Sequence, residues 1–134
     1  MQDETQLMSE AVAAMGRAYA PYSNFPVGAA IRDETGTIHA GANVENAAYP
    51  VGNCAEASAI AVMVMAGGTR ITMIAVAGGD GKLLCTPCGA CRQRIREFGD
   101  TETPILVGGP DGVQRRFTLG ELLPESFGPE NLAE

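Results

Sequence analysis

Apolar and polar positions along this chain follow first a helical and then a strand-like spacing. Residues 4–20 carry an apolar stripe at helical spacing, and Pro21 ends the predicted helix. Residues 27–46 predict a β-hairpin, because two short runs of strand-forming residues flank a polar turn at residues 33–36.

The remainder of the chain predicts two more helices and three more strands. The run at residues 54–68 is rich in alanine and longer than a typical strand, which favours a buried helix that ends at Gly67 and Gly68. The other expected elements are a central strand at 70–79, an amphipathic helix at 88–99, and strands at 103–109 and 113–119. Helices that alternate with strands after an initial hairpin indicate an α/β protein, a three-layer α/β/α sandwich with a mixed five-stranded sheet.

Length and charge narrow the class of protein. With 134 residues, of which 46% are hydrophobic, the chain is expected to fold as one domain, residues 1–134. The formal net charge of −7 argues against nucleic-acid binding, which needs Lys and Arg to neutralise phosphates. The acidic first residues do not resemble a signal peptide, and the longest apolar run, residues 59–66, is far shorter than the ~20 residues that span a bilayer. We therefore expect a cytoplasmic protein that binds neither nucleic acid nor membrane.

Four cysteines without a secretion signal favour metal binding or catalysis over disulfides. Cys88 and Cys91 are three residues apart at the expected start of a helix, so both thiols can face one metal ion. Cys54 opens the other buried helix, two residues before Glu56. Cys85 falls at the end of a strand run, where a thiol is commonly just a small buried apolar group.

Coordination number separates the alternatives for these thiols. Three protein ligands leave one position on a tetrahedral zinc for water, whereas all four thiols would close the site into a structural one. Three unrelated core cysteines are the remaining alternative. A water made acidic by zinc needs a proton carrier, and Glu56 has the right chemistry, although the helix dipole alone also favours a glutamate in a first turn.

Two motifs carry a family resemblance. Cys54-Ala55-Glu56 and Pro87-Cys88-Gly89-Ala90-Cys91 match the pattern of zinc deaminases, in which a His or Cys precedes x-Glu and a later Pro-Cys-x-x-Cys. The stretches PYSNFPVGAA, NVENAAYP and LLPESFGPENL extend the likeness over most of the chain. The sequence therefore resembles the zinc-dependent cytidine deaminases of the short-subunit, homotetrameric type.

The resemblance implies hydrolytic deamination of cytidine and 2'-deoxycytidine in pyrimidine salvage, by a homotetramer with shared active sites. It implies one zinc per subunit on Cys54, Cys88 and Cys91, with Glu56 as the proton carrier. The implied substrate-binding residues are Phe25, Asn43, Val44, Glu45, Ala55 and, from a neighbouring subunit, Phe127. Independently of the resemblance, Asn43 and Glu45 point to one side of an extended segment, and such a pair suits either sugar hydroxyls or an ordinary polar strand end.

The chain departs from the family pattern at Ala57, where an arginine often stands. Such a cation would offset the negative charge of three thiolates, and Arg92 is the candidate replacement, with a solvated helix arginine as the alternative. Arg94 and Arg96 are expected on a solvated helix face. His39, the single histidine, is expected in a surface or packing role. Two other functions remain open: a deaminase of a modified cytosine nucleoside such as an antibiotic, and a non-catalytic zinc-stabilised binding module.

Overall fold

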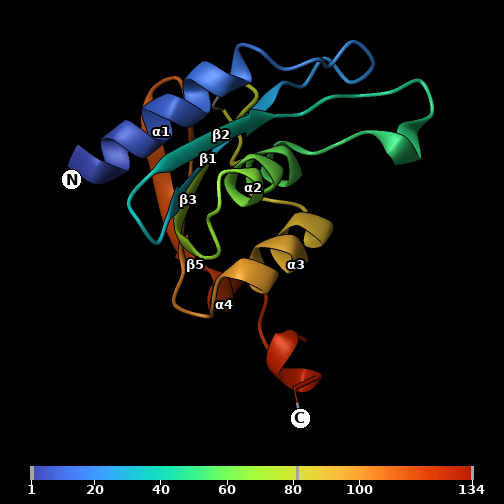
Figure 1. Cartoon of the computed structure of the whole chain (residues 1–134). Helices are drawn as coiled ribbons and strands as arrows, with labels where there is room; N and C mark the ends of the chain where they lie inside the picture. The colour runs from blue at the N-terminus through green and yellow to red at the C-terminus, as the bar shows by residue number, and fades with distance from the viewer. Residues whose placement is uncertain (1, 81, 134) are drawn as a thin grey trace.

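In the computed structural model, which describes residues 2–80 and 82–133, five strands form one sheet in the order β2-β1-β3-β4-β5 (Figure 1). The strands are β1 (Val27–Asp33), β2 (Ile38–Ala42), β3 (Ile71–Gly78), β4 (Pro104–Gly109) and β5 (Gly112–Thr118). The pair β3 and β4 is parallel, and the other neighbouring pairs are antiparallel. The prediction of a mixed five-stranded sheet is confirmed.

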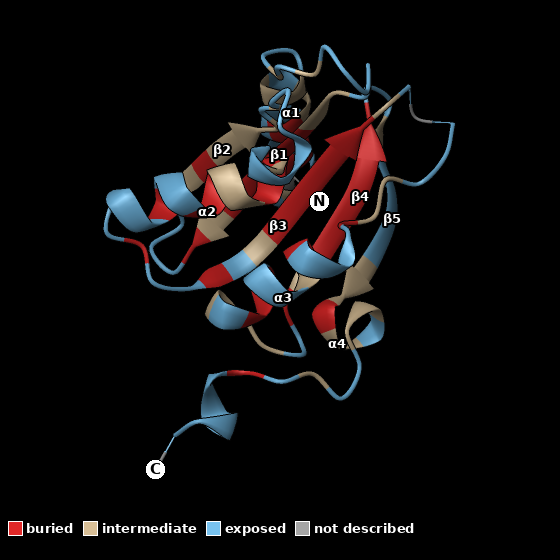
Figure 2. Ribbon diagram, turned by 90° about the vertical axis from the view of Figure 1, so that its right-hand side faces the viewer, coloured by how far each residue is buried: buried red, intermediate tan, exposed pale blue. Residues whose placement is uncertain are grey.

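Helices cover both faces of this sheet. One face packs against α1 (Gln2–Met15), and the other packs against α2 (Ala55–Met65), α3 (Gly89–Phe98) and the short α4 (Leu119–Leu122). Figure 2 shows the second face, with β3 and β4 buried beneath the helices. The predicted three-layer sandwich is therefore confirmed.

The two central strands have a core on each face. In β3, Ile74 and Val76 point to the cluster under α2 and α3, whereas Ala75 and Ala77 point to the cluster under α1. Such continuous burial is what a strand enclosed by two helical layers requires. The small alanines leave space for α1, and the larger β-branched side chains fill the layer under α2 and α3.

Glycines allow the helices to approach the hairpin strands closely. A Cβ atom at Gly28 of β1 would lie 2.0 Å from the carbonyl oxygen of Ala11 in α1. A Cβ atom at Gly41 of β2 would lie 2.4 Å from the backbone nitrogen of Ala59 in α2. Any larger residue at either position would push a helix off the sheet.

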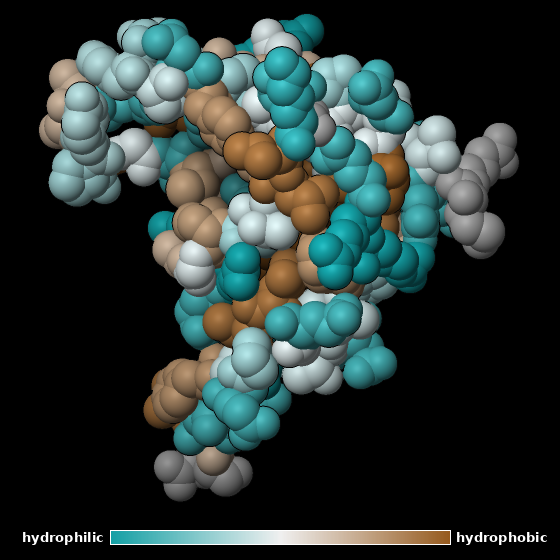
Figure 3. All heavy atoms as spheres, turned by 180° about the vertical axis from the view of Figure 1, so that it is seen from behind, coloured by the Kyte–Doolittle hydropathy of each residue, from teal (hydrophilic) through white to brown (hydrophobic). Residues whose placement is uncertain are grey.

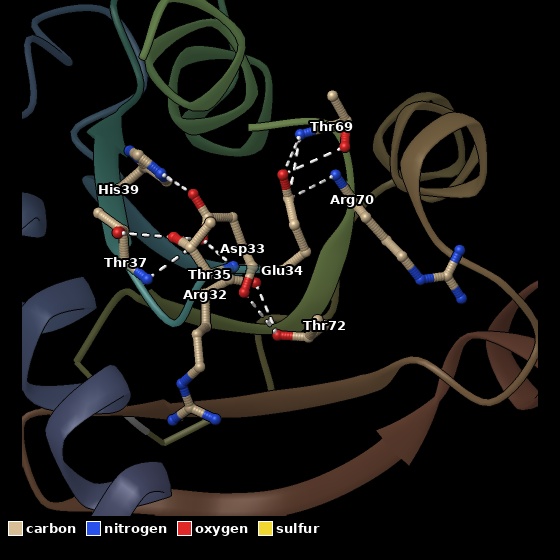
Figure 4. A network of polar contacts seen from close by, with 9 residues as sticks. All are labelled: Arg32, Asp33, Glu34, Thr35, Thr37, His39, Thr69, Arg70 and Thr72. Atoms are coloured by element: carbon tan, nitrogen blue, oxygen red, sulfur yellow. Dashed lines mark hydrogen bonds and ion pairs between the residues drawn. The ribbon is translucent and has the colours of Figure 1, made fainter. Parts of the chain in front are cut away.

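A buried polar cluster fixes the turn between β1 and β2 (Figure 4). The Asp33 carboxylate accepts hydrogen bonds from the backbone nitrogens of Thr35 and Thr37, at 2.8 and 3.1 Å. Its other oxygen lies 2.7 Å from Nε2 of His39, and both side chains are only 5% exposed. Of the surface or packing role expected for His39, the structure shows the buried one, with a hydrogen bond to Asp33.

Two details of the chain differ from the sequence-based expectation. The first helix ends at Met15, well before Pro21, because the chain turns to pair with another segment: Tyr19 exchanges backbone hydrogen bonds with Asn43 and Glu45. The short helix α4 was not predicted. It begins at a capping box in which Thr118 and Glu121 satisfy each other's backbone nitrogens.

Two segments extend away from the body of the molecule in Figure 1. One lies between β2 and α2 and contains the 3₁₀ turn Tyr49–Val51, and the other is the C-terminal segment with the 3₁₀ turn Pro129–Asn131. Within residues 2–80 and 82–133, no helix combines the length and the apolar character needed to cross a membrane.

Candidate metal centre and active site

Three thiols from two helix starts converge on one point. The sulfur atoms of Cys54, Cys88 and Cys91 all lie within 4.8 Å of one another. Cys54 is the N-cap of α2 and Cys88 is the N-cap of α3, while Cys91 is fully buried in the first turn of α3. The structure thus brings together the three cysteines that the sequence singled out.

This group fits a zinc ion. Zinc–sulfur bonds of about 2.3 Å in a tetrahedron separate the sulfurs by about 3.8 Å, so small side-chain movements suffice to close the group around the metal. Among the described residues, the group contains three thiols and excludes Cys85. A three-thiol set leaves one coordination position for another ligand, which distinguishes it from a closed structural site.

Glu56 lies beside these sulfurs in the first turn of α2. Its side chain is only 4% exposed. Burial raises the pKa of the Glu56 carboxyl, since a buried carboxylate loses its hydration. Burial also raises the pKa of the Cys54 and Cys91 thiols. A divalent cation reverses this preference because it deprotonates the thiols that bind it.

Cys85 belongs to the connection between β3 and α3, not to the end of a strand as expected. β3 already ends at Gly78. The Cys85 side chain is partly buried against the core cluster, and burial raises its pKa to about 11. The thiol therefore stays neutral near pH 7, in keeping with a packing role.

A pocket of about 210 Å³ opens beside the metal centre. It brings together six of the predicted site residues, although they come from distant parts of the sequence. Its lining residues are Phe25, Val27, Asn43, Cys54, Ala55, Glu56, Cys85, Thr86 and Cys88. Val27, Cys85 and Thr86 were not predicted as pocket residues. The one sequence signal for a place in the pocket was that these three residues lie close to Phe25 or Cys88 along the chain.

Asn43 and Glu45 both fasten the segment that carries Phe25. Asn43 accepts a hydrogen bond from the backbone nitrogen of Val27 at 2.9 Å and donates one to the carbonyl of Phe25 at 3.1 Å. The Glu45 carboxylate accepts from the backbone nitrogens of residues 22 and 23, at 2.9 and 3.1 Å. Both side chains therefore reach the same segment, as positions two apart in an extended stretch should. They lie just beyond β2, which ends at Ala42.

Three predicted contact residues lie outside this pocket in the isolated chain. Val44 is about half exposed and forms backbone bridges to Tyr19 and Asn53. Glu45 lines a separate hollow of about 310 Å³. Phe127 lies in the C-terminal segment, 57% exposed, where its carbonyl accepts a hydrogen bond from Gln93 of α3.

Two arginines of α3 are tied to other parts of the chain. Arg92 donates from Nε to the carbonyl of Pro87 at 2.7 Å and from Nη1 to the carbonyl of Leu122 at 2.8 Å. Arg96 is buried and pairs with Glu130 at 2.8 Å. The expectation that Arg92 supplies the missing cation is therefore wrong, because its guanidinium binds backbone carbonyls. A solvated position for Arg96 is also wrong.

Arg94 is the arginine that reaches the thiol group. Its Nη1 donates to the sulfur of Cys91 at 3.6 Å. The thiols in turn raise the pKa of Arg94, with Cys91 the largest contributor. The spacing of three residues on one helix was a signal available in the sequence, because such positions share a face.

The Cys-x-Glu motif at the start of one helix faces the Pro-Cys-x-x-Cys motif at the start of another, on a mixed sheet between helical layers. This combination defines a zinc-dependent deaminase. The family model for the cytidine and deoxycytidylate deaminase zinc-binding region matches residues 1–107. The chain belongs to this family.

Known relatives agree over almost the whole length. The cytidine deaminase of Sporosarcina psychrophila is 41% identical over 131 residues, which are 98% of this chain and 96% of that protein. The cytidine deaminase of Halalkalibacterium halodurans is 40% identical over 130 residues, covering 97% and 98% of the two chains. The crystal structure of cytidine deaminase from Burkholderia pseudomallei matches with a TM-score of 0.83 at 41% identity, over 91% of this chain and 97% of that one.

Proposed function

We propose that this chain catalyses the hydrolytic deamination of cytidine and 2'-deoxycytidine to uridine and 2'-deoxyuridine, with release of ammonia, in pyrimidine salvage. The observation that carries the proposal is the convergence of three thiols and the buried Glu56 on a pocket that also contains Phe25 and Asn43. Relatives about 40% identical over nearly the full length are cytidine deaminases.

Cys54, Cys88 and Cys91 hold the zinc ion, one per subunit. When bound, zinc polarises water so that hydroxide is available near neutral pH. The N-termini of α2 and α3 point toward the thiols and favour their negative charge.

Glu56 carries protons between the attacking water and the cytosine ring. Its carboxylate takes a proton as the water oxygen bonds to carbon 4, and it delivers that proton to ring nitrogen 3. The hydroxyl now on carbon 4 gives up its proton through Glu56 to the exocyclic amine, the carbon–nitrogen bond breaks as the carbonyl forms, and ammonia leaves. Its burial keeps bulk water from competing for these protons.

Phe25, Asn43 and Ala55 form the wall against which the nucleoside binds. Asn43 keeps one donor hydrogen and one acceptor lone pair beyond its two internal hydrogen bonds, so it can still bind a ribose hydroxyl. Glu45 can act only as an acceptor for a ribose hydroxyl, and it reaches the nucleoside from the adjoining hollow. The backbone of Ala55 contacts the base, and Val44, whose backbone is paired with Asn53, holds Asn43 and Glu45 in place.

The chain acts as one domain, residues 1–134, in a cytoplasmic homotetramer in which Phe127 enters a neighbour's pocket. Exposed apolar side chains on the projecting turn and on α2 support assembly, namely Tyr49, Val51, Val62, Val64 and Met65. Hydrophobic side chains also gather at the surface in the middle of the face drawn in Figure 3. Phe127 is exposed and lies outside the pocket of its own chain, which leaves its ring free to serve another subunit.

The test combines metal content with turnover. Purified protein is assayed for zinc by atomic absorption, and for cytidine conversion by ultraviolet absorbance and ammonia release. We expect one zinc per chain and release of one ammonia for each uridine formed. Zinc without turnover of any nucleoside would favour a binding module instead, and turnover restricted to modified cytosine nucleosides would favour the antibiotic-directed alternative.

A further inference from the structure

The loaded metal centre needs a positive charge that its ligands do not supply. Three thiolates around one divalent ion leave a net negative charge, and each helix N-terminus offsets roughly half a charge at most. Cys54 and Cys88 cap the helices, but Cys91 lies within α3 and is 0% exposed, so water cannot solvate its sulfur. The sulfur of Cys91 is therefore the ligand atom that most needs a donor from the protein.

Arg94 meets this need from the same helix. Its Nη1 lies 3.6 Å from the Cys91 sulfur, whereas Arg92 is bound to backbone carbonyls and Arg96 to Glu130. Within the described residues, Arg94 forms no close ion pair with a carboxylate, so its guanidinium stays free to donate to the sulfur, although its charge also acts on Glu56.

We propose that Arg94 is a positioning residue that compensates the charge of the metal centre through the Cys91 sulfur, in the absence of a cation at position 57. The proposal rests on the function proposed above, since it assumes that the three thiols hold zinc. By withdrawing electron density from the sulfur, the guanidinium strengthens zinc binding and leaves the metal a better Lewis acid.

The two helices offer equivalent places for such a cation. Ala57 follows Cys54 by three residues on α2, as Arg94 follows Cys91 by three residues on α3. Ala57 and Arg94 also line the same hollow of about 450 Å³ between the helices. An arginine placed at position 57 would therefore direct its guanidinium toward the same group of sulfurs from the opposite side.

The experiment removes the positive charge of Arg94 or moves it to position 57, and measures zinc binding. Arg94→Gln, Arg94→Lys and the double variant Ala57→Arg/Arg94→Gln are compared with Arg17→Gln, a control with the same loss of charge at an exposed position just after α1. Zinc affinity is measured by competition with a coloured chelator. Cobalt-substituted protein reports the sulfur-to-metal absorption band, and circular dichroism verifies folding.

We expect Arg94→Gln to weaken zinc binding about tenfold, the lower end of the range for partners of metal ligands, because Arg94 is exposed to solvent. The cobalt band should move to longer wavelength, because the sulfur becomes a stronger electron donor. Arg94→Lys should restore part of the affinity and the double variant most of it, while Arg17→Gln matches the unchanged protein.

Unchanged zinc affinity and an unchanged cobalt band in a folded Arg94→Gln protein would overturn the proposal. Loss of affinity that neither Arg94→Lys nor the double variant restores would overturn it as well, in favour of a local packing role. Both readouts are independent of turnover. If the variants change zinc affinity and the cobalt band as expected but the unchanged protein converts no nucleoside, the proposed function is refuted and the role of Arg94 stands.

Discussion

The thiol of Cys85 occupies the space beside Gly78, where a Cβ atom would lie 2.3 Å from its sulfur. This contact holds Cys85 in the pocket wall but outside the group of sulfurs that can bind one ion. The four cysteines of the chain therefore divide into three that can hold one metal ion and one that packs in the pocket wall. Matched substitutions distinguish the two roles.

Cys85→Ser and Cys88→Ser change the same atom and should differ sharply in zinc binding. Cys88→Ser should weaken zinc binding by more than about a hundredfold, since even outer partners of metal ligands cost 10–100-fold. Cys85→Ser should retain zinc with a lower melting temperature, because a hydroxyl packs less well against the core. Equal zinc loss in both variants would show that Cys85 is a fourth ligand.

Glu56→Gln should separate metal binding from proton transfer. The amide keeps the shape of the buried side chain but cannot accept or deliver a proton. We expect kcat to fall by about 10²–10⁴-fold with zinc content unchanged, as measured by ammonia release and atomic absorption. Wild-type turnover in this variant would remove Glu56 from the mechanism.

A shared active site predicts complementation between two impaired variants. Phe127→Ala should raise KM for cytidine by about tenfold or more, since stacking of a base on an aromatic ring contributes about 1–3 kcal/mol. When Phe127→Ala and Glu56→Gln chains are unfolded and refolded together, some pockets should receive Glu56 from one chain and Phe127 from the other.

Kinetics at low cytidine concentration check this prediction. The mixture should then exceed the average activity of the two separate preparations. Activity equal to that average would place Phe127 outside the neighbouring pocket.

Asp33 should make the stability of the fold depend on acid pH. Hydrogen bonds from Thr35, first through its hydroxyl, and the contact with His39 hold the pKa of Asp33 well below its usual range. A lowered pKa in the folded state means that the stabilisation is present above pH ~4 and is lost as the pH falls further.

Asp33→Asn should therefore be less stable than the unchanged protein at pH 7, and the difference should shrink below pH 4. Urea denaturation between pH 3 and pH 8 measures this difference. Asp111→Asn is the control, because Asp111 lies exposed in the turn before β5. A constant difference at all pH values would mean that the Asp33 carboxylate has no special stability in the folded state.

The pattern of apolar residues was sufficient for the fold class and for the position of most elements. Residues 54–68 predicted a helix, and α2 spans Ala55–Met65. The first helix was predicted too long, because nothing in its own sequence shows that Tyr19 pairs with residues 43–45. Helix α4 was missed because four residues give too few turns for a periodic signal.

The sequence by itself determined which chemistry is available. The motifs Cys-x-Glu and Pro-Cys-x-x-Cys identify the thiols and the carboxyl of the site, because local spacing fixes which side chains share the start of a helix. The three-residue spacing of Arg94 from Cys91 was also present in the sequence, but only the tertiary structure drew Arg92 and Arg96 away to other acceptors and kept the Cys85 thiol apart. Arg92, Arg94 and Arg96 are nearly equivalent in the sequence, and their partners at Leu122, Cys91 and Glu130 differ. The physical reason is that long flexible side chains take whichever acceptor the fold places within reach, and that placement depends on contacts between distant segments.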